Sequence, residues 1–260
     1  TDDQGYFEFT FPRDAAWAQF DVHSLGYRDA RVDVSPDGPV KSVTVAMEQK
    51  VEEISEVVVQ ALRAKEDAPV VYQNIGREEL QKVNLGQDLP ILLDQTASVV
   101  TSSDAGAGIG YTNMRIRGSD QTRINVTVNG IPINDSESQG VFWVNMPDLT
   151  SSTSSIQIQR GVGTSTNGPG AFGASVNLNT ESFDPDPSAT LTLAGGSFNT
   201  FKRNLEFSTG LLADRISLSG RISKITSDGY VDRASSDLSS YYFNAKYYGE
   251  KTSLSFITFS

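Results

Sequence analysis

The chain has 260 residues and a formal net charge of −11, from 21 Lys and Arg against 32 Asp and Glu. This acidic balance excludes nucleic acid as a main partner, because phosphate binding needs a basic patch. With no cysteine and a single histidine, His23, the chain has no thiolate or multi-histidine metal site and no cysteine nucleophile. We therefore predict no catalytic residue, no metal site and no cofactor. The 22 Gly, 10 Pro and many short alternating segments indicate a mostly β protein.

Residues 1–50 read as turns and short strands. Phe7, Phe9 and Phe11 alternate with polar residues, as in a half-buried strand. Similar alternation predicts strands at residues 18–22 and 43–47, and His23 is expected to be an ordinary strand or turn residue. The segment resembles the end of a carboxypeptidase-regulatory-like (transthyretin-like) domain, which implies a partial β-sandwich. About fifty residues make a thin sandwich core, so we expect opening strands to be absent.

Residues 51–62 contain the sequence VEEISEVVVQA, a short exposed strand that needs a partner edge. One interpretation is capture by another protein through β-augmentation, in which backbone hydrogen bonds give the affinity. About five such bonds, at ~0.5–1.5 kcal/mol each, suit a contact that forms and releases. The other interpretation is that residues 56–59 form the last strand of the sandwich. The sequence leaves both open.

Residues 63–183 combine short helices with strands and glycine-rich connections, which predicts a mixed α+β domain. Helices are expected at residues 76–83 and 88–94, the second with a proline in its first turn. Asn129 followed by Gly130 is typical of a type I′ hairpin turn. The strand-containing stretches are residues 113–118, 123–135 and 155–180.

The glycine-rich stretch at residues 155–180 is not predicted to bind phosphate. A phosphate-binding loop needs Gly-Lys-Ser/Thr and a following helix, whereas residues 174–178 alternate as a strand. Arg115 and Arg117 are expected on one side of the strand at residues 113–118, because residues two apart share a face. Together with Arg160 they are either surface charges or partners of carboxylates in a confined space, a role that suits guanidinium groups.

Four segments occur in a fixed order in this domain: NMRIRG from Asn113, VNGIPIND from Val128, IQIQRG from Ile156 and GPGAFGASVNLNT from Gly168. As a set they resemble the plug domain of TonB-dependent outer-membrane receptors. The resemblance covers about residues 52–180 and implies a plug over residues 63–183. It also implies that residues 51–62 hold the TonB box, although Gln60 departs from the commoner threonine before the final alanine. The implied TonB-binding residues are Ser55, Glu56, Val57, Val58, Val59, Gln60 and Ala61.

The resemblance also implies roles for single residues of the plug. Arg115, Arg117 and Arg160 are expected to pair with carboxylates of the barrel wall and so to hold the plug. The loops SSDAGAGIGYT and NDSESQGVFWVN are expected to face outward and to touch the ligand. For Phe142 and Trp143, packing in the plug core is the alternative to contact with the ligand. The candidate ligand contacts are Tyr111, Ser136, Glu137, Gln139, Phe142 and Trp143.

The sequence pattern changes at residues 188–260, after the segment Asp-Pro-Asp-Pro at residues 184–187, which interrupts regular secondary structure. Apolar and polar residues alternate through five segments, and tyrosines lie near the segment ends. A soluble sandwich also alternates, but behind a plug-like domain the pattern favours the first strands of an antiparallel transmembrane β-barrel. Residues 210–214 and 249–250 are brief periplasmic turns in this interpretation, and residues 226–239 are a long external loop. The alternating apolar positions include Leu191, Leu193, Leu205, Phe207, Ile216, Leu218, Ile222, Tyr241, Phe243, Tyr247, Leu254 and Phe256.

About five strands cannot close a barrel, since the smallest single-chain barrels have ~8. An open sheet in lipid leaves two edges of unpaired backbone groups, each group costing several kcal/mol. We therefore expect the sequence to be the front part of a longer receptor.

The resemblance implies a ligand-gated importer in the outer membrane of a Gram-negative bacterium, with residues 1–62 in the periplasm. The expected cargo is a scarce nutrient, most simply a ferric siderophore or another iron chelate. The expected partners are TonB with ExbB and ExbD, outer-membrane lipid and lipopolysaccharide. No enzyme activity is predicted. The alternative is a non-transporting outer-membrane module for ligand binding, signalling or adhesion.

Overall fold

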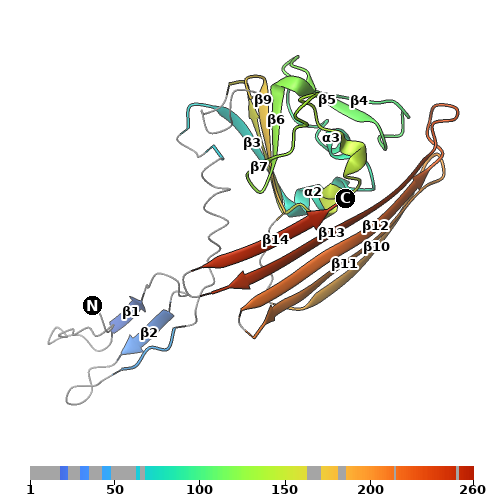
Figure 1. Cartoon of the computed structure of the whole chain (residues 1–260). Coiled ribbons are helices and arrows are strands. Elements are labelled where there is room, and N and C mark those ends of the chain that lie inside the picture. Colours follow the sequence, from blue (N-terminus) through green and yellow to red (C-terminus); the bar gives the residue numbers. More distant parts are fainter. Residues whose placement is uncertain are drawn as a thin grey trace. The chain divides into compact units, whose positions relative to one another are not determined.

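The structure is a computed structural model that divides into two units, Thr1–Glu53 and Ile54–Ser260 (Figure 1). Three predicted features lie outside the described residues: the phenylalanine strand near the start, His23 and the predicted TonB box at residues 55–61. The described residues are 18–22, 30–34, 43–47, 63–64, 68–162, 171–180, 186–213, 215–249 and 252–260.

Among its described residues, the first unit contains an antiparallel hairpin of β1 (Ala18–Val22) and β2 (Ala30–Val34). Strand β1 was predicted from its alternation, and Phe20 pairs with Val32. The strand predicted at residues 43–47 is wrong, because these residues pair with no strand in the described part of the chain. The β-sandwich predicted for residues 1–50 remains a prediction.

The central domain, described from residue 63 to residue 180, is built on a five-stranded mixed sheet in the order β3-β8-β9-β6-β7. Strands β6 and β9 are parallel and the other neighbours are antiparallel. A separate hairpin, β4-β5, and short helices complete the domain. The strands are β3 (Val71–Gly76), β4 (Val99–Ser103), β5 (Thr112–Ile116), β6 (Ile124–Val128), β7 (Ile131–Pro132), β8 (Ser155–Arg160) and β9 (Ala174–Asn179). The helices are α2 (Arg77–Val83), α3 (Leu89–Leu92) and the 3₁₀ turns η1 (Gln121–Arg123), η2 (Trp143–Asn145) and η3 (Leu149–Ser152).

Local sequence explains most of these elements. Asn129 and Gly130 both have positive φ, +50° and +83°, so the predicted type I′ turn joins β6 to β7. Both predicted helices are present, and the strand after the glycine-rich stretch is β9, as predicted. One prediction needs correction. Arg117 does not share a strand face with Arg115, because β5 ends at Ile116 and Arg117 turns away with φ +52°.

The domain core lies between the apolar face of the mixed sheet and the elements that cover it. Strands β8 and β9 are buried along their whole central stretch, with aliphatic side chains on one face and amides on the other. This division keeps one face of the sheet for the core and leaves a polar face for contacts with the start of the domain. The core includes Leu93, Ile116, Trp143, Ile156, Ile158, Val176 and Leu178.

The remaining strands form one antiparallel sheet in simple chain order, β10-β11-β12-β13-β14 (Figure 1). Their number and alternation match the predicted amphipathic segments. The loop between β12 and β13 is shorter than predicted, residues 228–235, because Thr226 and Asp237 already pair across the two strands. Within the described residues, no helix is long and apolar enough to cross a membrane. The strands are β10 (Ser188–Gly196), β11 (Thr200–Leu212), β12 (Ile216–Ser227), β13 (Ser236–Tyr248) and β14 (Ser253–Phe259).

The two faces of this sheet differ in chemistry. One face exposes large apolar side chains, which the alternation predicted. The opposite face is polar and buried in part against the central domain, where contacts such as Lys202–Asp148 join the two. The exposed apolar residues include Leu191, Leu193, Leu205, Phe207, Ile216, Ile222, Tyr241, Tyr247, Leu254 and Phe256. The buried polar residues of the other face are Lys202, Asn204, Arg221, Ser223, Ser227, Ser240, Asn244 and Lys246.

Candidate functional site

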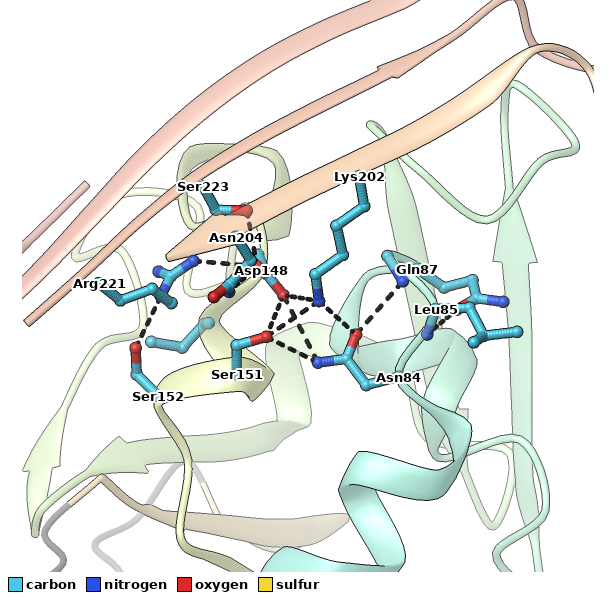
Figure 2. A network of polar contacts seen from close by, with 12 residues as sticks. Asn84, Leu85, Gln87, Asp148, Ser151, Ser152, Lys202, Asn204, Arg221 and Ser223 are labelled. Carbon is cyan, nitrogen blue, oxygen red and sulfur yellow. Dashed lines mark hydrogen bonds and ion pairs between the residues drawn. The ribbon is translucent and has the colours of Figure 1, made fainter. Parts of the chain in front are cut away.

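A buried carboxylate, Asp148, marks the junction between the central domain and the five-stranded sheet (Figure 2). It caps the turn η3 and has a left-handed backbone, φ +57° and ψ +22°. This conformation is one that Asp and Asn tolerate better than most residues. The turn thereby directs the carboxylate at the polar face of β11 and β12. Its side chain is fully buried.

Both carboxylate oxygens are saturated with donors (Figure 2). Oδ1 accepts from Lys202 Nζ at 2.7 Å and from Ser151 Oγ at 2.6 Å. Oδ2 accepts from Asn204 Nδ2 at 2.7 Å and from Ser223 Oγ at 2.6 Å. Arg221 Nη1 lies 3.3 Å from Oδ2 and adds a second ion pair. Except for Ser151, these donors come from the sheet, so the carboxylate binds the two parts of the molecule together.

The two cations have partners on the central domain besides Asp148. Lys202 Nζ donates also to Asn84 Oδ1 at 3.2 Å and to Ser151 Oγ at 3.0 Å, so all three of its protons have acceptors. Arg221 Nε donates to Ser152 Oγ at 2.7 Å. Buried ions are tolerated only when they are paired and fully hydrogen-bonded. The network meets this condition at Lys202 and at Asp148.

The ionisation of Asp148 follows from this environment. Burial by itself raises the pKa of the carboxyl, but the charges of Lys202 and Arg221, together with their hydrogen bonds and that of Ser151, outweigh it. The pKa of Asp148 therefore lies below its usual range. The carboxylate stays charged at neutral pH, and the junction is an ionic contact.

A polar cavity of about 90 Å³ adjoins the network between the central domain and strands β10–β13. Its wall is mostly hydroxyl and amide groups, and it includes Arg77 and Glu206, whose charged atoms are 3.6 Å apart. Arg77 comes from α2 and Glu206 from β11, so this pair is a second ionic link across the junction.

The three arginines predicted to hold the central domain lie elsewhere. Arg160 Nη1 donates to the backbone oxygen of Ala97 at 3.0 Å. Arg115 lines a surface groove of about 310 Å³ that also includes Asp120. In the described part of the chain, none of the three forms an ion pair with β10–β14. Their pairing with barrel carboxylates remains a prediction about other parts of a barrel wall.

At the junction that the structure describes, the main ionic contact has the reverse polarity to the prediction. The central domain supplies the carboxylate, Asp148, and the sheet supplies the cations, Lys202 and Arg221. Sequence reasoning missed all three. The available signal was the presence of Lys and Arg at inward positions of otherwise Ser- and Asn-rich strands, where a charge needs a partner.

The first described residues of the domain are attached to its sheet. Arg63 Nη1 donates to Ser155 Oγ at 2.9 Å, and Nη2 reaches the backbone oxygens of Ser155 and Asn177 at 3.1 and 3.2 Å. Ala64 exchanges two hydrogen bonds with the Gln157 side-chain amide, at 2.6 and 3.0 Å. Burial lowers the pKa of Arg63. This anchor ties the chain just after the predicted TonB box to the central strands β8 and β9.

The loop at residues 135–140 is held by local hydrogen bonds and presents its predicted ligand contacts to solvent. Asp135 Oδ1 accepts from the backbone N–H groups of Glu137 and Ser138 at 3.1 and 2.6 Å. Bonds to Ser138 keep the pKa of Asp135 below its usual range. Ser136, Glu137 and Gln139 are exposed. Their contact with a ligand remains a prediction.

The aromatic candidates for ligand contact differ in their exposure to solvent. Tyr111 is 62% exposed and Phe142 is 46% exposed, so both are accessible. Trp143 is 3% exposed and belongs to the domain core, which removes it from the ligand-contact set and favours its packing alternative. The physical reason is that η2 turns the indole inward against the sheet.

A second contact joins the central domain to the sheet at the long β12–β13 loop. The N–H groups of Tyr230 and Val231 both donate to the backbone oxygen of Ala105, at 2.9 and 3.1 Å. The Tyr230 ring packs edge-on against Phe198 with centroids 5.4 Å apart, yet Tyr230 remains 69% exposed. Sequence reasoning did not select Tyr230, although an aromatic residue after Asp-Gly in the longest polar loop was the available signal.

These contacts describe a mixed domain seated on the polar face of strands whose other face is apolar. Residues 64–175 match the family described as the TonB-dependent receptor plug domain. No curated protein sequence matches the chain. The central domain is therefore a plug domain, as predicted.

Solved structures support the same fold. The siderophore receptor PirA from Acinetobacter baumannii matches with a TM-score of 0.60 and 17% identity, over 79% of this chain and 32% of that one. The ferric yersiniabactin uptake receptor FyuA from Yersinia pestis matches with a TM-score of 0.59 and 13% identity, over 76% and 33%. The pyoverdine outer-membrane receptor FpvA from Pseudomonas aeruginosa matches with a TM-score of 0.58 and 16% identity, over 74% and 27%. The chain thus spans about a quarter to a third of the length of these structures.

Proposed function

We propose that this receptor imports a scarce extracellular ligand across the outer membrane of a Gram-negative bacterium, with its plug closing the path at rest. The observation that carries the proposal is the match of residues 64–175 to the plug family, in a domain held by Asp148 to the polar face of β11 and β12. The exposed apolar face of the same sheet suits contact with lipid. Iron chelates are the proposed cargo, because the three similar structures are siderophore or pyoverdine receptors.

Energy for transport is proposed to come from TonB, with ExbB and ExbD, acting on residues 55–61 in the periplasm. Arg63 and Ala64 follow this segment after Leu62 and are bonded to β8 and β9. A pull on the segment would therefore act on two central strands of the plug sheet and not on an unattached linker. Asp148, Lys202 and Arg221 would resist the pull on the side of the barrel wall.

The ligand is proposed to bind where plug and barrel loops meet. The carbonyl of Ala105 accepts both bonds from the β12–β13 loop, one of them from the backbone of Tyr230. The side chains of Tyr230 and of Tyr111, which follows Ala105 closely in the sequence, are exposed. Exposed side chains of residues 135–142 supply further polar and aromatic groups. Aromatic residues with one polar atom suit a ligand that carries both rings and oxygens.

The decisive experiment separates binding from energised uptake. The full-length receptor carrying Val58→Pro is compared with Val58→Thr, which keeps the backbone N–H and the β-branched side chain. Proline removes a donor from any added strand, so the proline variant should lose uptake of radioactive iron chelate while still binding it at the cell surface. Normal uptake by Val58→Pro refutes the coupling role of this segment.

The competing function is a module that binds or senses a ligand without transporting it. The same cells without TonB distinguish the two functions. Ligand accumulation that depends on TonB supports import, whereas surface binding with no accumulation in either strain supports the module.

A further inference from the structure

Two cationic side chains lie side by side on neighbouring strands, on the outward face of the five-stranded sheet. Strand register places Arg203 directly opposite Lys224, on the face that carries the exposed apolar residues. Side chains at directly opposed positions lie about 5 Å apart at Cβ, and like charges there destabilise a sheet. Arg203 is exposed, and the Lys224 side chain is 39% exposed. A pair in this position gains from an anion.

The protein itself neutralises only part of this charge. Lys224 Nζ forms an ion pair with Asp237 Oδ1, and Asp237 is 69% exposed. Arg203 instead stacks on Phe201, with its guanidinium carbon 4.9 Å from the ring centroid. The three charged groups carry a net charge of +1. The guanidinium is oriented by the ring, and its donors suit bidentate binding of a phosphate.

The neighbouring rows of side chains show where the cation pair lies along the strands relative to the apolar part of this face. Four successive outward rows across β11–β13 are free of charge, and they begin directly beside the pair with Leu205, Ile222 and Tyr241. They end near the brief turns, at Leu212 and Ile216. At about 6.8 Å for each two-residue row, the four rows extend about 20–27 Å along the strands. This approaches the ~25 Å apolar band of outer-membrane barrels.

The cation pair therefore lies at one boundary of the apolar band, on the side of the long β12–β13 loop. In barrels of this type, long loops are extracellular and brief turns are periplasmic. We propose that Arg203 and Lys224 bind the phosphorylated headgroup of a glycolipid in the outer leaflet, with Asp237 limiting the affinity. The acyl chains of that lipid would cover Leu205 and Ile222 below. This inference rests on the proposed outer-membrane location.

The test uses the full-length receptor purified in detergent, with bis-phosphorylated lipid A as the probe and phosphatase-treated lipid A as its partner probe. Native mass spectrometry gives the bound fraction. Arg203→Gln and Lys224→Gln should each weaken binding about fivefold, since one cation near the surface contributes about 1 kcal/mol. Asp237→Asn should strengthen it by a similar factor. Arg215→Gln, an exposed arginine in the opposite turn, should change it less than twofold.

The comparison of Lys224→Gln with Asp237→Asn is the sharpest part of the test. Both substitutions break the same ion pair but change the local charge in opposite directions. A shift in the same direction for both, or equal binding of dephosphorylated lipid by the wild type, overturns the proposal. TonB-dependent uptake is measured on the same variants and is expected to persist. Failure of this site is therefore distinguishable from failure of the transport function.

Discussion

Replacing Asp148 by asparagine tests the junction with the smallest change of shape. Asparagine has the same size and tolerates the left-handed backbone at this position, so the turn η3 should be kept. The amide has one oxygen instead of two, and its NH₂ group would face donors. Depending on its orientation, that group meets either Lys202 Nζ or the side chains of Asn204 and Arg221.

The expected cost follows from the charges that remain. Lys202 and Arg221 have fully buried side chains, at 1% and 2% exposure, and would lose their shared counter-ion. Breaking a buried ion pair by removing one partner costs about 3–5 kcal/mol. At 1.36 kcal/mol for each tenfold change, the population of the unseated plug should rise between about 10² and 10⁴-fold.

Hydrogen exchange of the full-length receptor in detergent, followed by mass spectrometry, measures this population. Peptides that cover residues 148–160 report local opening of the plug beside the wall. Exchange in these peptides should accelerate strongly in the variant, while β12 and β13 exchange as in the wild type. Asp94→Asn is the matched control, because Asp94 is an exposed plug aspartate with a single side-chain bond, from Thr101.

A double-mutant cycle completes the test. Lys202→Met removes one of the stranded cations, so Asp148→Asn should cost less in that background than in the wild type. Additive effects of the two substitutions, or a loss below 1 kcal/mol for Asp148→Asn alone, would refute the view that the ionic network seats the plug.

Three further outcomes are expected from other parts of the plug. Burial raises the pKa of Asp88 to about 7 despite a bond from Thr112, so the folded plug retains a proton that the unfolded chain loses near pH 4. The contribution of Asp88 to the free energy of unfolding should fall by about 1.4 kcal/mol per pH unit between pH 4 and 7 and stay low above pH 7. Asp88→Asn should remove this pH dependence in melting curves, and an unchanged pH dependence contradicts the assignment. Arg63→Gln should leave ligand binding intact but lower the force needed to extract the segment after residue 61 in single-molecule pulling, compared with Arg77→Gln on α2; equal forces would count against the anchor. Gly173→Ala should destabilise the plug by about 1–3 kcal/mol in the same melting assay, because the new Cβ would lie 2.6 Å from Ser119 Cβ and 2.8 Å from the Arg123 oxygen, whereas Gly76→Ala meets no atom within 4 Å.

The parts of the fold that were predictable depend on short-range patterns. Alternation with period two is visible in residues 216–222 or 241–247 without knowledge of any partner strand. The type I′ turn at Asn129 and Gly130 is likewise a property of two adjacent residues. Predictions failed where the pairing between strands decides which residues form a strand. Residues 43–47 alternate but have no partner strand among those described, and Arg117 follows the last paired residue of its strand.

The candidate site was harder to predict because its members are far apart in the chain. Asp148 and Lys202 are separated by 54 positions, and Asp148 and Ser223 by 75. The sheet residues that face the plug have the same polarity as residues that face water, so the alternation cannot tell a buried seat from a solvated face. The family resemblance directed attention to Arg115, Arg117 and Arg160, whereas the main ionic contact of the described junction uses a plug carboxylate and the second uses a different plug arginine, Arg77.

The chemistry of the junction suits the proposed transport, in which the plug must be both fixed and removable. An apolar interface is held by its buried area, and that stabilisation is lost in full when the plug moves. At the polar seat, water can replace each hydrogen bond of Asp148, Lys202 and Ser151, so each bond to a charged group contributes only about 1.5–3 kcal/mol net. Water also rehydrates the charges as they separate, which offsets the Coulomb energy lost. A single missing partner is costly because a buried charge then stays dry and unpaired, but complete separation into water is not. The network therefore specifies one position for the plug while leaving its removal within reach of the pull that we propose on residues 55–61.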